Sequence, residues 1–565
     1  MIGNPLSAQK NVIVINENNA VLPLVKKSIL PSKVKSCAKL YSKIPKFVDY
    51  YHSLGYLAFS VDSIMEDSAV CKVCIFQGNQ YKSTVIIVEE AENNLIEEAN
   101  LSSYSKNGLL SLGNYPTLSG KLIDYYENNG FPFVEVYLDS LSLHPDSIIS
   151  RLIIDKHDYI TFDSIILQGD VKLSGSFLYP YLGLKKKQKY NESLIRKIPQ
   201  LISELDFVTE VRPAGVEFIE KSAYLYLYLN KLKVNQFDGY LGIIPEERNS
   251  GKFTLNGEIS LSLNNVFTLG ESLNLLWRSP ERYSQYLNIN VDFPYLLKTP
   301  FGFNFNFILD KNDTSYLTMN YIVGLQYSFQ GNNYLKAYFD YSTSAILAAD
   351  LLVVDNENIN FADYKRSMYG VEFKYRKLDY IYNPHKGYSF LLNASVGNRK
   401  IVKNSKADDS FYDGIEMTRL LYKFFADLNG FIPLHKKWVL ALSAKLGTLM
   451  GSANLVNELF KIGGFNTIRG FNEFEINAST YAVGQFELRF IFARKSYLNA
   501  FFDIGWYEKN IAGKYLNDTP FGFGLGIAFD TKAGLFYLMY ALGSQFNKLA
   551  SLKSGILHFG IKVNF

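Results

Sequence analysis

Side chains that often carry catalysis occur in this chain, but their spacing favours no reaction. None of the histidines belongs to an HExxH metal-binding spacing, and the chain contains neither a GxSxG motif nor a P-loop. We therefore expect that the protein is not an enzyme, has no catalytic residue and uses neither a metal nor another cofactor. The histidines are His52, His144, His157, His385, His435 and His558.

The cysteines are Cys37, Cys71 and Cys74, and the last two form the sequence CKVC. This spacing resembles half of a zinc site, but no second pair or histidine cluster accompanies it. The stretch looks extended, and positions three apart on a strand face opposite sides. A shared metal is therefore disfavoured, and the role of the three cysteines stays open.

A single arginine stands out in the stretch FKIGGFNTIRGFNEFEINAST. Gly463 and Gly464 precede Arg469, and Gly470 and Phe471 follow it directly. A cation among glycines and aromatic residues is either solvated or holds its loop against another part of the molecule. The elements around the loop must decide between the two.

The composition points to a membrane barrel. The chain has 565 residues, of which 41 are Tyr and 42 are Phe, and aromatic residues gather where a barrel surface meets the two membrane interfaces. The net charge of +4 is too small to indicate nucleic-acid binding. No run of about 20 apolar residues predicts a membrane helix. The opening MIGNPLSAQ is either the remainder of a signal peptide or an ordinary start.

From about residue 233 onward the chain reads as alternating strands. In KFTLNGEISLSLN and in FGFNFNF, apolar and polar residues alternate, which predicts one apolar and one polar face for each strand. Short turns alternate along the chain with long connections such as 344–364, 398–415 and 449–479, as in membrane barrels. The pattern predicts about sixteen antiparallel strands. They are expected to begin near residues 235, 252, 265, 284, 300, 316, 333, 365, 387, 416, 437, 480, 497, 520, 533 and 555.

The N-terminal part contains a repeat of about 75 residues that reads strand, helix, strand, strand. The stretches 49–64, 124–141 and 201–218 align, the third more faintly. Gly55 and Gly130 fall where a helix would end on a left-handed residue. The predicted fold is thus three α+β units followed by an all-β transmembrane barrel. The predicted boundaries are 1–77, 78–157, 158–232 and 233–565.

This organisation resembles the BamA–TamA superfamily of outer-membrane assembly and secretion barrels, and the repeats look like its POTRA domains. The repeat signature is visible as YYHSLGYLAFSV and, altered, as YYENNGFPFVEV. The more specific likeness is the pair Gly463 and Gly464 followed by Ile468-Arg469-Gly470-Phe471, because the family carries this motif in the sixth outer loop. The predicted strands place the loop between the eleventh and twelfth crossings.

The resemblance implies that this loop folds into the barrel lumen and that Arg469 meets acids of the inner wall. Glu487 and Asp503 match the family's partner positions on the next two strands. The alternation agrees, because their neighbours Phe486 and Phe502 take the opposite, outward parity. A guanidinium suits such a site since it can bind carboxylates through two hydrogen bonds. The loop-locking residues are therefore expected to be Gly463, Gly464, Ile468, Arg469, Gly470, Phe471, Glu487 and Asp503.

By the same resemblance, the protein is expected to insert other proteins into the outer membrane, with its N-terminal domains in the periplasm. A seam between the first and last strands would act as a lateral gate that includes Gly239, Gly242, Phe559 and Phe565. The expected partners are unfolded outer-membrane or secreted client proteins, periplasmic chaperones, outer-membrane lipids and lipoprotein subunits, with no nucleic acid. Two alternatives are a polypeptide secretion pore of the two-partner type and a passive barrel or subunit of a larger envelope complex.

Overall fold

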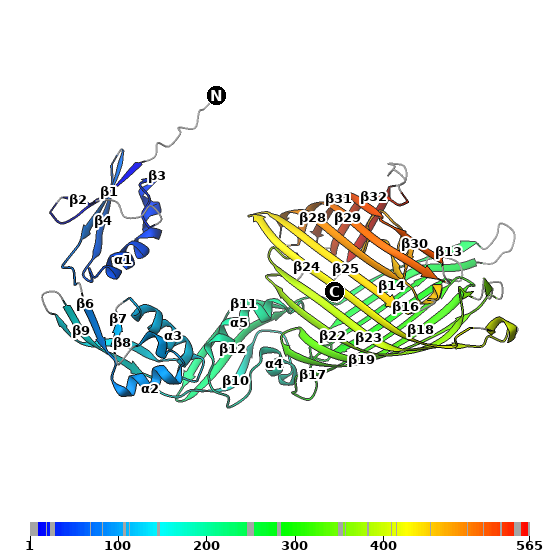
Figure 1. The fold of residues 1–565 in the computed structure, drawn as a ribbon, viewed down its shortest axis with the longest axis horizontal. Coiled ribbons are helices and arrows are strands. Elements are labelled where there is room, and N and C mark those ends of the chain that lie inside the picture. Colours follow the sequence, from blue (N-terminus) through cyan, green and yellow to red (C-terminus); the bar gives the residue numbers. More distant parts are fainter. Residues whose placement is uncertain are drawn as a thin grey trace, which may run out of the picture. The chain divides into compact units, whose positions relative to one another are not determined.

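The computed structural model describes residues 10–562 except 19, 23–28, 68, 82, 106–108, 112, 144–146, 246–252, 280–283, 349–353, 356–357, 381–382, 408, 414, 452–453, 494, 512–513, 532–533 and 547–554. The chain divides into two compact bodies (Figure 1). The N-terminal body comprises Met1–Phe162, Lys187–Ser193 and Phe218–Ala223. The barrel body comprises Asp163–Lys186, Leu194–Glu217 and Tyr224–Phe565.

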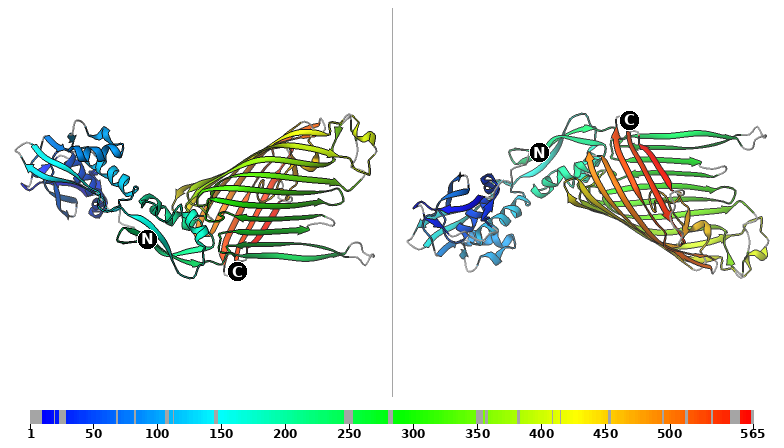
Figure 2. Two further views of the ribbon diagram at one scale, coloured as in Figure 1. Left: turned by 90° about the horizontal axis from the view of Figure 1, so that it is seen from below. Right: turned by 90° about the horizontal axis from the view of Figure 1, so that it is seen from above.

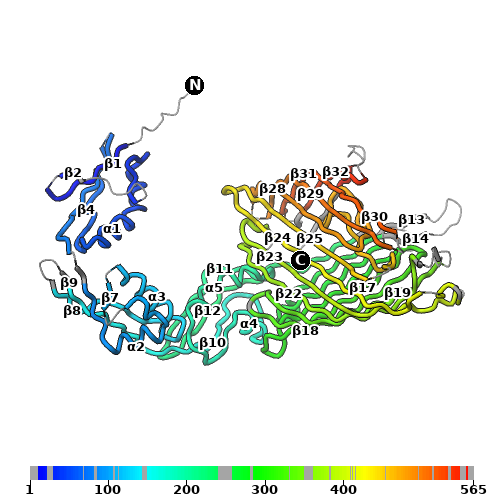
Figure 3. The backbone as a smooth tube through the Cα atoms, in the orientation of Figure 1, coloured from blue at the N-terminus to red at the C-terminus, as the bar shows by residue number. Residues whose placement is uncertain are grey.

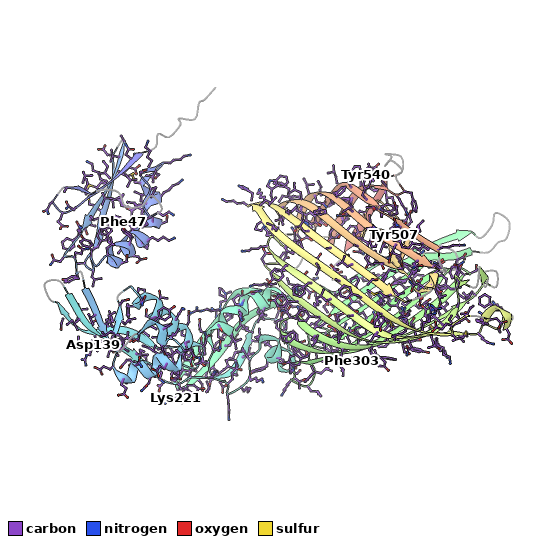
Figure 4. All side chains as sticks on the ribbon, in the orientation of Figure 1. Phe47, Asp139, Lys221, Phe303, Tyr507 and Tyr540 are labelled. Atoms are coloured by element: carbon purple, nitrogen blue, oxygen red, sulfur yellow. A yellow bond between two sulfur atoms is a disulfide. The ribbon has the colours of Figure 1, made fainter. Side chains whose placement is uncertain are left out.

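The first repeat is a sheet covered by one helix. The sheet has the order β2-β1-β5-β4, with β3 also paired to β1. Phe47 of this helix, α1, is buried in the core of the repeat, and it is labelled in Figure 4. Its elements are β1 (Lys10–Ile15), β2 (Val21–Leu22), β3 (Lys33–Val34), η1 (Cys37–Lys43), α1 (Ile44–Ser53), β4 (Ser60–Glu66) and β5 (Val70–Phe76).

A disulfide ties the first repeat together. Cys37 of η1 is bonded to Cys71 of β5, and both residues are buried in the core of this repeat. Cys74 keeps a free thiol. The CKVC sequence is therefore divided between a structural bond and a separate thiol, and the bond reaches outside the motif.

The second repeat has the same plan. Its sheet order is β7-β6-β9-β8, and the core includes Leu118 and Leu122 of α3. Gly55 and Gly130, which follow α1 and α3, have φ angles of 92° and 99°, the left-handed region expected there. The elements are β6 (Ser83–Ile87), α2 (Glu90–Glu98), η2 (Ser102–Tyr104), β7 (Leu109–Ser111), α3 (Tyr115–Glu127), β8 (Glu135–Leu143) and β9 (Ser147–Asp155).

The third repeat forms a sheet of order β10-β12-β11 with two helices, and the tube in Figure 3 leads from it into the barrel. Its elements are β10 (Thr161–Gln168), α4 (Gly175–Leu182), α5 (Glu192–Ser203), β11 (Val208–Ile219) and β12 (Ser222–Lys231). Most of this repeat belongs to the barrel body.

Within the barrel body, the third repeat is seated on turns at the barrel end where β13 begins, and α4 lies against the end of β18 (Figure 1). The backbone N–H of Ser174 donates to the carbonyl of Thr268 at 2.8 Å. The Tyr295 hydroxyl donates to the carbonyl of Gly331 at 2.7 Å. Gly331 in turn donates its N–H to the carbonyl of Tyr181 in α4 at 3.0 Å. The bonds of Thr268 and Gly331, which lie in two separate turns, fix the repeat to the barrel, and the Tyr295 bond holds the second of these turns.

A buried acid lies in the same junction. Glu204, just after α5, has an oxygen 3.9 Å from the Arg376 guanidinium of barrel strand β22. Burial raises the pKa of Glu204, and the charge of Arg376 opposes this shift. The pair is desolvated but not closely bonded, so part of the cost of burying the carboxylate remains.

The barrel is one antiparallel sheet that runs from β13 to β33 (Figure 2). Its strands are β13 (Gln236–Pro245), β14 (Phe253–Asn264), β15 (Ser272–Ser279), β16 (Gln285–Phe293), β17 (Phe301–Asn312), β18 (Tyr316–Gln330), β19 (Asn333–Ile346), β22 (Asp363–Leu378), β23 (Gly387–Val402), β24 (Thr418–His435), β25 (Trp438–Met450), β28 (Thr480–Ala493), β29 (Ser496–Ile511), β30 (Lys514–Asp518), β31 (Phe521–Thr531), β32 (Gly534–Ser544) and β33 (Ile556–Lys562). A separate small hairpin joins β20 (Val354–Asp355) to β21 (Asn358–Ile359).

In the described part of the chain, the seventeen strands of this order make sixteen crossings. β30 and β31 both pair with β29, one along its second half and the other along its first half. They are one strand interrupted at residues 519–520. The predicted count of about sixteen is therefore confirmed, and a closed single-chain barrel requires an even number of this kind.

The two faces of the barrel sheet differ as the alternation predicts. On β29, Phe502 and Ile504 are exposed on the outer face, whereas Asn499 and Asp503 are buried on the inner face. Exposed apolar side chains recur on the outer face, where they would meet lipid rather than water. Figure 4 shows the side chains along these strands, with Phe303 of β17 labelled. Among the described residues, no helix is both long and apolar enough to cross a membrane.

Candidate functional site

The site is built on the loop that joins β25 and β28, the eleventh and twelfth crossings. A 3-10 turn, η5 (Val456–Glu458), is followed by a short hairpin of β26 (Phe460–Ile462) and β27 (Ile476–Ala478). The tip of this hairpin carries residues 463–475, including the arginine motif. The hairpin brings the two ends of the tip together.

Arg469 is buried against the inner wall, where it binds two acids from adjacent strands. Its Nε and Nη2 donate to the two oxygens of Asp503 at 2.8 and 2.6 Å, and its own backbone N–H donates to the same carboxylate at 2.9 Å. Its Nη1 donates to Glu487 at 3.1 Å. The side chains of Arg469 and Asp503 are 5% and 0% exposed. The structure thus brings together the arginine and both acids that were expected to meet it.

Side chains that the sequence did not single out complete the cluster. The Arg469 guanidinium lies over the ring of Phe501, 3.7 Å from its centroid, a favourable cation–π arrangement. The other oxygen of Glu487 accepts hydrogen bonds from Arg489 at 3.0 Å and from Asn499 at 2.7 Å. Phe501, Arg489 and Asn499 share the inward parity of the acids, a signal that would have nominated them. Glu487 therefore has further partners, whereas Asp503 depends on residue 469 for three hydrogen bonds.

Glycines on both the loop and the wall permit the close contact. Gly463, Gly464 and Gly470 have φ angles of 113°, 91° and 92°, which disfavour any other residue. On the wall, a Cβ at Gly522 would lie 1.9 Å from the Arg469 carbonyl oxygen, and one at Gly543 would lie 2.3 Å from that of Gly470. The two wall glycines were not predicted, because alternation alone gives no reason to prefer glycine there.

Apolar residues beside the arginine hold the tip against the same wall. Ile468 and Phe471 are buried in one cluster with Ile462, Ile476 and Tyr507. Tyr507 belongs to β29 and is labelled in Figure 4. The tip is thus held by apolar packing as well as by charge.

The predicted gate residues lie in the two strands at the ends of the sheet order, as far as they can be described. Gly239 and Gly242 are in β13, where their Cα partners are Ile259 and Asn256 of β14. Phe559 is in β33, opposite a residue of β32. Phe565 lies outside the described residues. A Cβ at Gly239 would lie 2.8 Å from a carbonyl oxygen of β14, so the glycine lets the two strands approach.

No metal-binding arrangement emerges in the part of the chain that the structure describes. No group of three or more His, Cys, Asp or Glu side chains there could hold a metal ion. The inner wall instead lines a cavity of about 1590 Å³ with polar and charged residues, among them Arg469, Glu487 and Arg489.

Comparison with known proteins agrees with this architecture. Residues 225–565 match the Omp85 superfamily domain. CdiB from Escherichia coli is 14% identical over 94% of this chain and 97% of its own, with a TM-score of 0.52. CdiB from Acinetobacter baumannii is 16% identical over 86% and 89%, with a TM-score of 0.50. The crystal structure of BamA from Haemophilus ducreyi lacking POTRA domains 1–3 is 15% identical over 86% and 100%, with a TM-score of 0.44. A search of curated proteins found no match.

Because the CdiB structures have low sequence identity to this chain, their likeness supports the fold alone. The Omp85 domain match covers more than half of the chain and therefore supports the superfamily. The match confirms the expected superfamily, fold class and localisation. Proteins of this superfamily transport or insert other proteins at the outer membrane without enzymatic chemistry. The chain belongs to the Omp85 superfamily, as an outer-membrane β-barrel with its N-terminal domains in the periplasm.

Proposed function

We propose that this protein inserts client proteins into the outer membrane through a seam between β13 and β33. The observation that supports this proposal is the pairing of these two strands. In the described residues, β13 is paired only to β14 and β33 only to β32, although Cα atoms of β13 and β33 approach within 8 Å. Each strand therefore presents a row of backbone groups to its neighbour across the seam.

The physical chemistry of the bilayer makes such a seam a site for strand exchange. Unpaired N–H and C=O groups are costly in lipid, where no water can bond to them. An incoming client strand can satisfy them by pairing with either edge, as in β-augmentation. The client gains backbone hydrogen bonds and lipid contact as it inserts, so the barrel needs only to lower the barrier and requires no nucleotide.

The N-terminal repeats have a place in the same proposal. We infer that residues 1–77, 78–157 and 158–232 are three POTRA domains that deliver clients in an extended form. Edge strands such as β8 and β11 end the sheets of the second and third repeats. Docking of periplasmic chaperones or lipoprotein subunits on these domains belongs to the proposal as well.

A second candidate function is secretion of a polypeptide through the lumen. The polar cavity of about 1590 Å³ favours it, because an unfolded chain needs a wet path. In that case the pinned loop would have to leave the lumen during transport. Insertion through the seam makes no such demand, which is why it stands first.

The two candidates can be separated by locking the seam. Cysteines are introduced at facing positions of β13 and β33, and the oxidised protein is reconstituted in liposomes with an unfolded barrel client. Insertion through the seam predicts that folded, heat-modifiable client appears only after reduction. Equal yields in the oxidised and reduced states would overturn the proposal. In cells, depletion should lower many outer-membrane barrels, whereas loss of a single secreted protein would indicate secretion.

A further inference from the structure

The arginine motif is not the only place where the loop is tied to the barrel. Glu458, the last residue of η5, pairs with Arg399 of β23 at 2.5 Å between Oε1 and Nη1. The two side chains are 0% and 1% exposed. The same carboxylate oxygen accepts the backbone N–H of Leu455 at 2.8 Å, which closes the turn. A fully buried ion pair of this kind needs both partners in place.

Neighbouring polar contacts hold the same turn on two further strands. The Asn457 amide donates to the Ser344 hydroxyl of β19 at 2.8 Å and to the carbonyl of Ala362 at 3.1 Å. The Tyr364 hydroxyl of β22 donates to the carbonyl of Asn457 at 3.3 Å. The first part of the loop is therefore fixed to β19, β22 and β23, the seventh to ninth crossings.

One more ion pair lies between these contacts and the arginine. Lys461 of β26 pairs with Asp310 of β17 at 2.5 Å and lies 5.7 Å from the ring of Tyr316 in β18. β17 is the fifth crossing and β29, which carries Asp503, is the thirteenth. In a ring of sixteen crossings, these strands stand on opposite walls.

The hairpin that carries Lys461 also packs against the opposite wall, because Ile462 is buried in one cluster with Tyr507 of β29. The loop is therefore in contact with the wall at the fifth to ninth crossings and with the wall at the twelfth and thirteenth. We propose that Arg399 and Glu458 form a second anchorage, which makes the loop a brace tied to both walls of the barrel.

The consequence is a division of labour along the loop. Arg469 fixes the tip of the loop, and the Arg399–Glu458 pair positions its stem. When either contact alone is lost, the other contact still holds the loop in the lumen. This inference goes beyond the proposed function, because the brace has the same anchorages whether clients leave through the seam or through the lumen.

The test uses the full-length protein in planar bilayers and in limited proteolysis with mass-spectrometric mapping. Glu458→Ala is expected to expose residues 454–462 to cleavage while residues 463–478 stay protected, and Arg469→Ala should do the reverse. Each single variant should raise the bilayer conductance less than the double variant does. The factor by which the double variant raises the conductance should exceed the product of the factors of the two single variants, because both sites hold the same loop.

Two further variants keep the test decisive if Glu458→Ala folds poorly. The exchange of charges in the variant Arg399→Glu/Glu458→Arg should restore protection of residues 454–462, as a positioning role requires. Lys403→Ala is the control, because Lys403 forms an exposed ion pair with Asp409 at 2.6 Å and should change nothing. Protection of residues 454–462 that is unchanged in Glu458→Ala, or conductances that simply multiply, would overturn the second anchorage.

Discussion

Replacing Arg469 by alanine should release the loop tip, and the structure indicates by how much. Asp503, whose side chain is fully buried, accepts three hydrogen bonds from residue 469, and the variant removes two of them together with the positive charge. Loss of one partner of a buried ion pair costs about 3–5 kcal/mol, mainly because the remaining charge stays buried. Glu487 loses less, since Arg489 and Asn499 still donate to it.

This free energy should appear as local opening of the loop rather than loss of the barrel. Since about 1.4 kcal/mol corresponds to a factor of ten, amide hydrogen exchange at residues 463–475 should accelerate by about two to three and a half powers of ten. Exchange in β28 and β29 themselves should change far less, because the ladder of the sheet does not depend on the arginine.

Two further variants test whether the lost ion pair causes the faster exchange. Arg469→Lys keeps the charge but loses the forked geometry, so its effect should be smaller, of the order of one charged hydrogen bond or about 1.5–3 kcal/mol. Asp503→Asn added to Arg469→Ala should recover part of the loss, because it removes the uncompensated charge. Acceleration below about threefold in Arg469→Ala, equal to roughly 0.6 kcal/mol, would refute the reasoning.

Three more predictions test other parts of the structure. Gly522→Ala places a Cβ against the loop backbone and should cost about 1–3 kcal/mol of tip docking in the same exchange assay, whereas Gly430→Ala, with open space at its Cβ, should be neutral. Reduction of the disulfide in the first repeat should cost that repeat about 2–4 kcal/mol, seen as faster tryptic cleavage of residues 29–66, whereas Cys74→Ser should leave cleavage unchanged. Burial raises the pKa of Glu204, so the folded junction binds the proton of this carboxyl group more tightly than the unfolded chain does. The stability of the junction should therefore fall as the pH rises from the ordinary pKa near 4.5 through the raised pKa of the folded state. Hydrogen exchange at residues 175–182 should follow this change, and Glu204→Gln should flatten it.

Each of these has a result that would count against it. Equal docking in the two glycine variants would mean that the wall does not touch the loop. A cleavage rate indifferent to reductant would mean that the disulfide does not hold the first repeat. A junction that becomes looser in acid would reverse the sign expected for an acid whose pKa is raised by burial.

Much of the barrel followed from local pattern. Because side chains of a strand alternate between two faces, parity alone assigned Glu487 and Asp503 to the lumen and Phe502 to the outside, and the structure places them so. Strand starts were also close, since turn residues interrupt the alternation. The third strand is the exception: it begins at Ser272 rather than near 265, because residues 265–271 form a turn that carries the contact of Thr268 with the third repeat. The first half of the fourteenth crossing, Lys514–Asp518, was missed because its break at Pro520 looks like a strand start.

The alternation of side chains does not predict which inward-facing residues contact one another. The sequence of this chain determined the superfamily, the crossings and the residues that face the lumen, because these depend on neighbours a few positions apart and on one specific loop motif. Only the tertiary structure showed that Cys37 bonds Cys71, that Gly522 and Gly543 make room for the loop, and that Arg399 meets Glu458. These partners lie from tens to more than seventy residues apart, and their meeting depends on how the sheet curls and how the loop is threaded through it.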